Sequence, residues 1–147
     1  MLNTAKFFEH VMPASILLLT LMLLSPLSSA VMLHESYSCE VKSIRLLDED
    51  GTAGLVGEGY QSRHLGSTFV IDRYTGRMLG QLKNHDGLDQ PEVMDFGSDK
   101  QSLKVITTYG PYVYIDYLIV EIYVDALDKP FMFVSSSTIY TGLCKGL

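Results

Sequence analysis

From Cys39 to Cys144 the sequence is a succession of short strand-like runs. The runs are rich in Val, Ile, Phe, Tyr and Thr, and Gly, Pro and Asp separate them at short intervals. No segment here keeps a long apolar period of 3.6 residues. The pattern predicts an all-β, antiparallel meander of about eight short strands. We expect strands at residues 39–47, 54–61, 67–72, 77–83, 102–109, 112–124, 131–135 and 138–144.

The first 30 residues predict a signal peptide. Lys6 and the α-amino group precede an apolar run at residues 16–24, and Pro26 and the small residues 28–30 follow it. This is the order of charged, apolar and small-residue segments that signal peptidase substrates share. We expect cleavage after residue 30, which leaves residues 31–147 as a single exported β domain, periplasmic or secreted.

An uncleaved membrane anchor is the alternative for the same segment. No charged residue and no histidine occurs from Val11 to Leu33, and a stretch of this length can span a tilted bilayer. Contact with a membrane is expected only in that case. Under both interpretations the rest of the chain is translocated.

Export gives the two cysteines, Cys39 and Cys144, a structural meaning. In an oxidising compartment, two cysteines near opposite ends of a small domain predict a disulfide. Cys39 opens the first run and Cys144 closes the last, so we expect the first and last strands to be neighbours. This favours a curled sheet or small barrel over a flat sheet with two open edges. A two-sheet sandwich is the alternative.

The chain is acidic, with 11 Lys and Arg against 17 Asp and Glu, a formal net charge of −6. Removing residues 1–30 takes away Lys6 and Glu9, one charge of each sign, so the exported domain keeps this value. Nucleic acids and anionic membrane surfaces require clustered Lys and Arg. The charge therefore argues against both partners and is compatible with a basic protein partner.

No motif of a catalytic, metal or nucleotide site is present. His34, His64 and His85 lack the spacing of metal ligands, and two cysteines without paired histidines fall short of a zinc site. We therefore predict no catalytic residue, no metal ligand and no cofactor. Calcium binding by the acidic segment 84–99 remains an alternative, beside partner contact and a plain solvated loop.

Two segments predict specific backbone features. In residues 72–77 (DRYTGR), we expect a tight turn in which Asp72 accepts backbone N–H bonds and Gly76 takes a left-handed conformation. Residues 112–124 fit two patterns. One is a β-bulge at Asp116 and Tyr117, which keeps Asp116 out of the core, and the other is a central strand buried on both faces.

Tyrosine is dense between residues 109 and 123, and the chain has no tryptophan. Exposed tyrosines supply apolar area with a hydrogen-bonding tip, and the acidic segment 84–99 adds charge that attracts a basic partner. We therefore predict a partner-binding surface there, although tyrosines are also ordinary strand residues. Its members are Tyr112, Tyr114, Tyr123, Asp86, Asp89 and Glu92.

These patterns lead to three functional hypotheses. The first is a non-enzymatic exported binding module that recognises a protein partner, for instance as an inhibitor of a basic hydrolase. The second is a carrier that encloses a small apolar ligand, as barrels of about eight strands do. The third is a hydrolase whose site follows no familiar motif.

Overall fold

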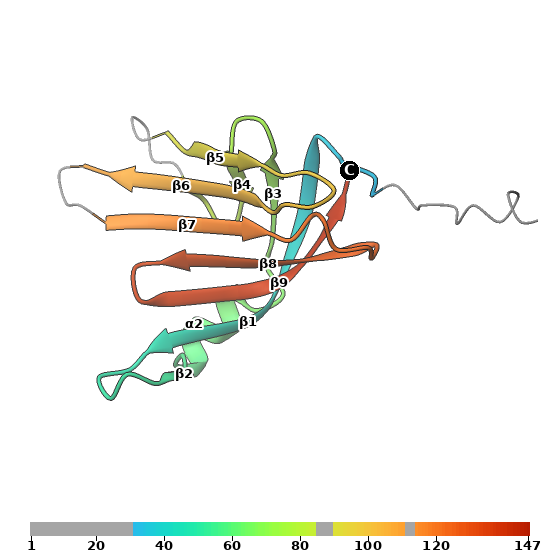
Figure 1. Cartoon of the computed structure of the whole chain (residues 1–147). Helices are drawn as coiled ribbons and strands as arrows, with labels where there is room; N and C mark the ends of the chain where they lie inside the picture. Colours follow the sequence, from blue (N-terminus) through green and yellow to red (C-terminus); the bar gives the residue numbers. More distant parts are fainter. Residues whose placement is uncertain (1–30, 85–89, 111–113) are drawn as a thin grey trace, which may run out of the picture.

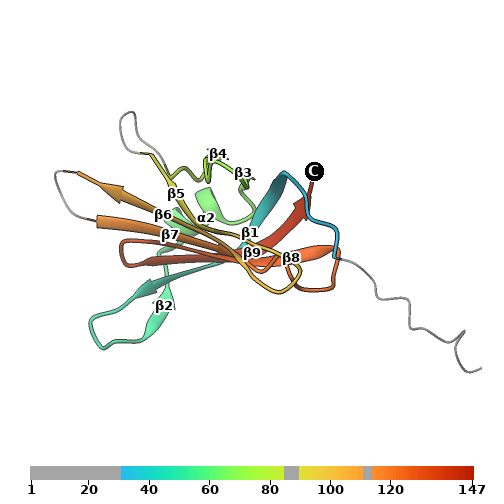
Figure 2. The same cartoon turned by 45° about the horizontal axis from the view of Figure 1, so that its top comes forward.

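The computed structural model describes residues 31–84, 90–110 and 114–147, which form a curled antiparallel sheet with one short helix (Figures 1 and 2). This confirms the all-β prediction. The strands are β1 (Ser36–Leu47), β2 (Ala53–Leu55), β3 (Thr68–Asp72), β4 (Met78–Gly80), β5 (Glu92–Phe96), β6 (Leu103–Tyr109), β7 (Tyr114–Val120), β8 (Asp128–Ser135) and β9 (Thr138–Gly146), and the helix is α2 (Glu58–His64).

Eight strands follow one another across the sheet in the order β4-β3-β1-β9-β8-β7-β6-β5, and β2 pairs with the end of β1. Strands β5 to β9 form a meander, while β1 lies between β3 and β9. The sheet curls into a half-barrel, and the layer that holds β3 and β4 faces the one that holds β5 and β6 (Figure 2).

Cys39 and Cys144 form the predicted disulfide. They are directly opposite in the β1–β9 ladder, with their Cα atoms 3.9 Å apart. The described residues contain no free cysteine. The bridge joins the first and last strands as expected, and it is typical of proteins in an oxidising compartment.

The core lies on one face of the sheet, where alternate side chains of each strand point inward. Phe69 of β3 packs edge-to-face against Phe131 of β8, with ring centroids 5.2 Å apart, so strands from both halves of the sheet share one core. The buried apolar residues are Tyr37, Cys39, Val41, Ile44, Val56, Phe69, Ile71, Met78, Leu82, Leu103, Val105, Leu118, Val120, Ile122, Phe131, Phe133, Tyr140 and Cys144.

Strand β7 departs from both predicted patterns. Its register with β6 and with β8 is unbroken, so there is no bulge at Asp116 and Tyr117. Strict alternation buries Asp116 with Leu118 and Val120, while Ile115, which the bulge placed in the core, is 46% exposed. The strand is thus buried on one face only. A hydrogen bond to the Asp116 carboxylate, described below, makes this inward position tolerable.

Two elements differ from the expected strand runs. Residues 54–61, expected as a strand, divide between β2 and α2, because Glu58 in the first turn and Arg63 and His64 in the last suit the helix dipole. The segment 84–99, expected as a loop, contains β5. The sequence of β5 does not show the alternation of apolar and polar residues that marks a strand, because large apolar side chains face solvent. Met94 is 60% exposed and Phe96 is 50% exposed.

The turn between β3 and β4 forms as predicted. Asp72 Oδ1 accepts the backbone N–H groups of Tyr74 and Thr75, at 3.0 and 2.7 Å, and Gly76 has φ +69°. The turn also reaches across the half-barrel. The Arg73 guanidinium donates to the carbonyl oxygens of Phe96 and Gly97, at 2.6 and 2.9 Å, which ties this turn to the end of β5.

Candidate functional site

Figure 1 shows the end of the sheet where β6 ends and β7 begins. Buried polar side chains gather on the core face there. The alternation that buries Leu103 and Val105 in β6 carries on to Thr107 and Tyr109, which are also buried. In β7 the inward positions at this end belong to Tyr114 and Asp116. We call these four residues, Thr107, Tyr109, Tyr114 and Asp116, the inner polar site.

Asp116 is the chemically distinctive member of the inner polar site. Its side chain is 4% exposed, and the Tyr109 hydroxyl donates to its Oδ2 at 2.7 Å. Its other oxygen, Oδ1, has no hydrogen-bond partner among the described residues, and the ion pairs found among them do not include it. A buried carboxylate is therefore held by a neutral donor rather than by a cation.

Thr107 lies directly opposite Asp116 in the β6–β7 ladder. It is 1% exposed, and its Oγ1 also has no hydrogen-bond partner within the described part of the chain. Buried polar atoms are nearly always hydrogen-bonded, so two such oxygens on neighbouring strands form an unusual pair.

The two tyrosines connect the buried carboxylate to the surface. The rings of Tyr109 and Tyr114 are stacked, with centroids 4.6 Å apart and planes 19° apart. Tyr109 is 8% exposed, whereas Tyr114 is 46% exposed. The inner polar site therefore begins in the core at Asp116 and reaches the surface at the Tyr114 ring.

A second group of polar side chains packs nearby from α2 and β9. The hydroxyls of Tyr60 and Tyr140 form a hydrogen bond, and the His64 ring lies over Tyr60 with centroids 4.4 Å apart. Burial chiefly raises the pKa of Tyr140, and the Tyr60 hydroxyl and the charge of Asp116 add to the rise. Tyr140 therefore stays a neutral phenol at physiological pH, close enough to Asp116 to sense its charge.

The predicted partner-binding residues fall in different places. Tyr114 belongs to the inner polar site. Tyr123 follows β7 at its other end, where Glu121 raises the pKa of its phenol through a hydrogen bond. Glu92 of β5 is exposed and pairs with Ile106, whose side chain lies on the opposite face from Thr107 and Tyr109. Tyr112, Asp86 and Asp89 lie outside the described residues.

Sequence reasoning missed Asp116 because it treated a charge in an apolar period as a sign of a bulge. A usable signal was present. The β6–β7 register that pairs Tyr109 with Tyr114 places the Tyr109 hydroxyl diagonally across from Asp116, on the same face. A phenol at that diagonal position is a ready donor for an inward carboxylate.

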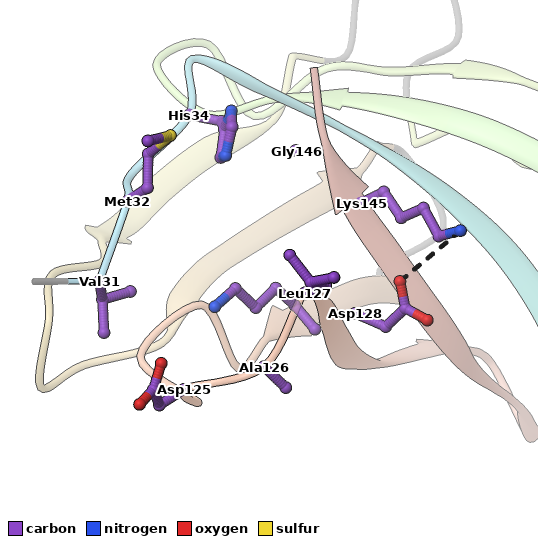
Figure 3. Close-up of a pocket in the computed structure, with 10 residues that line it drawn as sticks. Val31, Met32, His34, Asp125, Ala126, Leu127, Asp128, Lys145 and Gly146 are labelled. Atoms are coloured by element: carbon purple, nitrogen blue, oxygen red, sulfur yellow. Dashed lines mark ion pairs between the residues drawn. The ribbon is translucent and has the colours of Figure 1, made fainter. Parts of the chain in front are cut away.

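A pocket of about 800 Å³ lies at the opposite end of the sheet (Figure 3). Val31, Met32 and His34, the loop 125–127 and the ends of β8 and β9 line it. Both of its lysines have partners within the chain: Lys145 pairs with Asp128 at 3.8 Å, and the Lys129 amine donates to the Val124 carbonyl. Its one buried oxygen without a hydrogen bond, Asp128 Oδ1, lies beside the Lys145 ammonium, whereas Asp116 has no cation beside it among the described residues.

Across the described ranges, no three His, Cys, Asp or Glu side chains are placed to hold a metal ion together. No helix in that part of the chain is long and apolar enough to cross a bilayer. The chain matches no family model, and neither a curated protein nor a solved structure shows significant similarity to it.

Proposed function

We propose that the chain is a non-enzymatic binding module, exported to the periplasm or secreted, which recognises a protein partner at the end of the half-barrel that holds Tyr114. The observation that carries the proposal is the stacked pair of Tyr109 and half-exposed Tyr114 beside the buried carboxylate of Asp116. Interface centres are enriched in tyrosine, and a rigid ring loses little entropy on binding.

Two further observations support binding over catalysis and over enclosure of a ligand. The inner polar site holds a carboxylate, a threonine and tyrosines, but the Thr107 hydroxyl forms no hydrogen bond with Asp116 or another base among the described residues. The inside of the half-barrel is packed with large side chains such as Phe69, Phe131 and Phe133. Binding at the end of the sheet is therefore better supported than a ligand within it.

The test is affinity capture from the envelope extract of the source cells, using the full chain expressed with its own N-terminal segment and purified from the exported fraction. We expect Tyr114→Ala to lose the captured partner without a change in thermal midpoint beyond a few degrees, as for other surface substitutions. Tyr74→Ala is the matched control, because Tyr74 is 55% exposed and packs near Phe96 instead.

Tyr123→Ala tests the other end of β7 in the same assay. A partner that is lost with Tyr123→Ala and kept with Tyr114→Ala would contradict the proposed location. A capture that yields no specific protein with the unaltered chain would contradict the proposed function itself.

A further inference from the structure

We propose that the inner polar site binds a cationic side chain, the ammonium of a lysine or the guanidinium of an arginine, which the protein partner presents. The inference rests on the proposed function, and it specifies the chemistry that the partner must bring. The acceptors would be Asp116 Oδ1 and Thr107 Oγ1, with the Tyr109 and Tyr114 rings beside them.

The first argument is the balance of charge around Asp116. A buried carboxylate is costly unless it is paired or fully hydrogen-bonded, and here the described residues supply one neutral donor, the Tyr109 hydroxyl. A cation that donates to Oδ1 would neutralise the charge and satisfy the oxygen at once. The net charge of −6 attracts such a group over a longer range.

The second argument is the number and kind of acceptors. An ammonium carries three donors and no acceptor, so it can serve both Asp116 Oδ1 and the neighbouring Thr107 Oγ1. The stacked tyrosines provide the aromatic face over which cations bind favourably. Tyr114 is 46% exposed and is the member of the site at the surface, so a long side chain would enter beside its ring and displace it to reach the two buried oxygens.

The same geometry disfavours other ligands. An anion would meet the Asp116 carboxylate, and an apolar group would cover two polar oxygens without satisfying them. A divalent metal requires several carboxylate or carbonyl ligands, whereas Asp116 is the single carboxylate of the inner polar site.

The experiment is an NMR titration of the exported protein, labelled with ¹⁵N, with three small probes. N-acetyl-lysine amide and N-acetyl-arginine amide carry the cation, and N-acetyl-norleucine amide is an uncharged analogue of the first. We expect the cationic probes to shift the amide signals of Thr107, Tyr114 and Asp116, and the norleucine probe to leave them in place.

Asp116→Asn should weaken binding of the cationic probes at least tenfold, because it removes the negative charge that the cation meets at Oδ1, and tenfold corresponds to about 1.4 kcal/mol. Asparagine still offers an oxygen to the Tyr109 hydroxyl, which favours a folded variant. Thr107→Val is a second, nearly isosteric variant that should weaken lysine-probe binding on its own. Asp99→Asn, at an exposed site, controls for the loss of one negative charge.

Probe binding that is equal in Asp116→Asn and the unaltered protein, or equal for norleucine and lysine, would overturn the cation site. Partner capture separates this outcome from the proposed function. If Tyr114→Ala loses the partner while the probes do not bind, the proposed function stands and the cation site fails. If the probes bind through Asp116 and no partner is captured, the cation site stands and the proposed function fails.

Discussion

Asp72 shows how a single carboxylate directs the chain between two strands. Its Oδ1 accepts the N–H groups of Tyr74 and Thr75, and also the Thr75 hydroxyl at 2.8 Å. These bonds favour the ionised form. The Thr75 N–H bond is the main cause that holds the pKa of Asp72 below its ordinary value of 3.8. The turn is thus coupled to the charge of the residue that begins it.

A pH dependence of stability follows from that coupling. Because the pKa of Asp72 is lower in the folded state than in the unfolded state, its contribution is present above the unfolded pKa and is lost as the pH falls through the folded pKa. Asp72→Asn keeps an acceptor but no charge. We expect this variant to be about 1 kcal/mol less stable at pH 7, the difference between a charged and a neutral acceptor.

Urea unfolding of the unaltered protein and of Asp72→Asn from pH 7 to pH 3 measures the difference between their free energies of unfolding. This difference in unfolding free energy should shrink below about pH 4, because Asp72 of the unfolded chain takes up a proton there while the folded protein keeps it ionised to lower pH. Asp99→Asn controls for removal of a surface charge. A gap that stays constant down to pH 3 would show that the ionised form of Asp72 has no special role in the turn.

At the scale of elements, the β3–β4 turn closes the half-barrel by lying against β5 and β6. Gly76 makes this approach possible. A Cβ at position 76 would lie 2.7 Å from Val105 Cγ1 and 3.0 Å from Val93 Cγ2. Its φ of +69° is also a conformation that other residues adopt at a cost. The β3–β4 turn therefore meets β5 and β6 at a residue without a side chain.

Gly76→Ala should be strongly destabilising for both reasons. The left-handed backbone costs about 1–2 kcal/mol with a Cβ, and overpacking adds about 1–3 kcal/mol. Gly59→Ala is the control, because position 59 lies in α2 with nothing within 4 Å of its Cβ, and we expect a gain of about 0.5–1 kcal/mol there. Thermal unfolding of the two variants measures the contrast, and equal midpoints would contradict the contact.

The elements also show how far the sequence can be interpreted alone. The runs that became β1, β3, β6, β8 and β9 were predictable, because their apolar period and turn residues agree. Helix α2 was not, because it buries none of its seven residues fully and therefore shows no apolar helical period. Strand β5 was not, because Met94 and Phe96 face solvent. The inward position of Asp116 was not, because the charge in an apolar run suggested a bulge, whereas the register of β7 is unbroken.

At the scale of the whole molecule, the disulfide constrains most of the folded chain. Cys39 and Cys144 are 105 residues apart in sequence and adjacent in the sheet. In the chain-entropy model, a bridge that closes a loop of about 100 residues stabilises the folded state by about 4–5 kcal/mol, because it reduces the conformational freedom of the unfolded state. The bridge therefore acts on the unfolded ensemble more than on any local contact.

The variant that carries both Cys39→Ala and Cys144→Ala should lose about 4 kcal/mol of unfolding free energy by this model. Urea unfolding measures the loss, and thiol titration of the unaltered protein in denaturant without reductant should find no free thiol. The unaltered protein, unfolded in urea with reductant, controls for the lost sulfur contacts. A double variant with the same urea midpoint as the oxidised protein would contradict this role.

Strand β9 has a consequence for the order of folding. It pairs with β1 on one side and with β8 on the other. Strands β3 and β4 continue the sheet beyond β1, and β7, β6 and β5 continue it beyond β8. The β1 group and the β8 group are not paired with each other directly, so they cannot form one sheet before residues 138–146 take their place between them. The half-barrel therefore closes only when β1 and β9, which are far apart in the sequence, have paired, and such non-local pairing slows folding. A chain that stops short of β9 would expose the edges of β1 and β8, both free to pair with other chains.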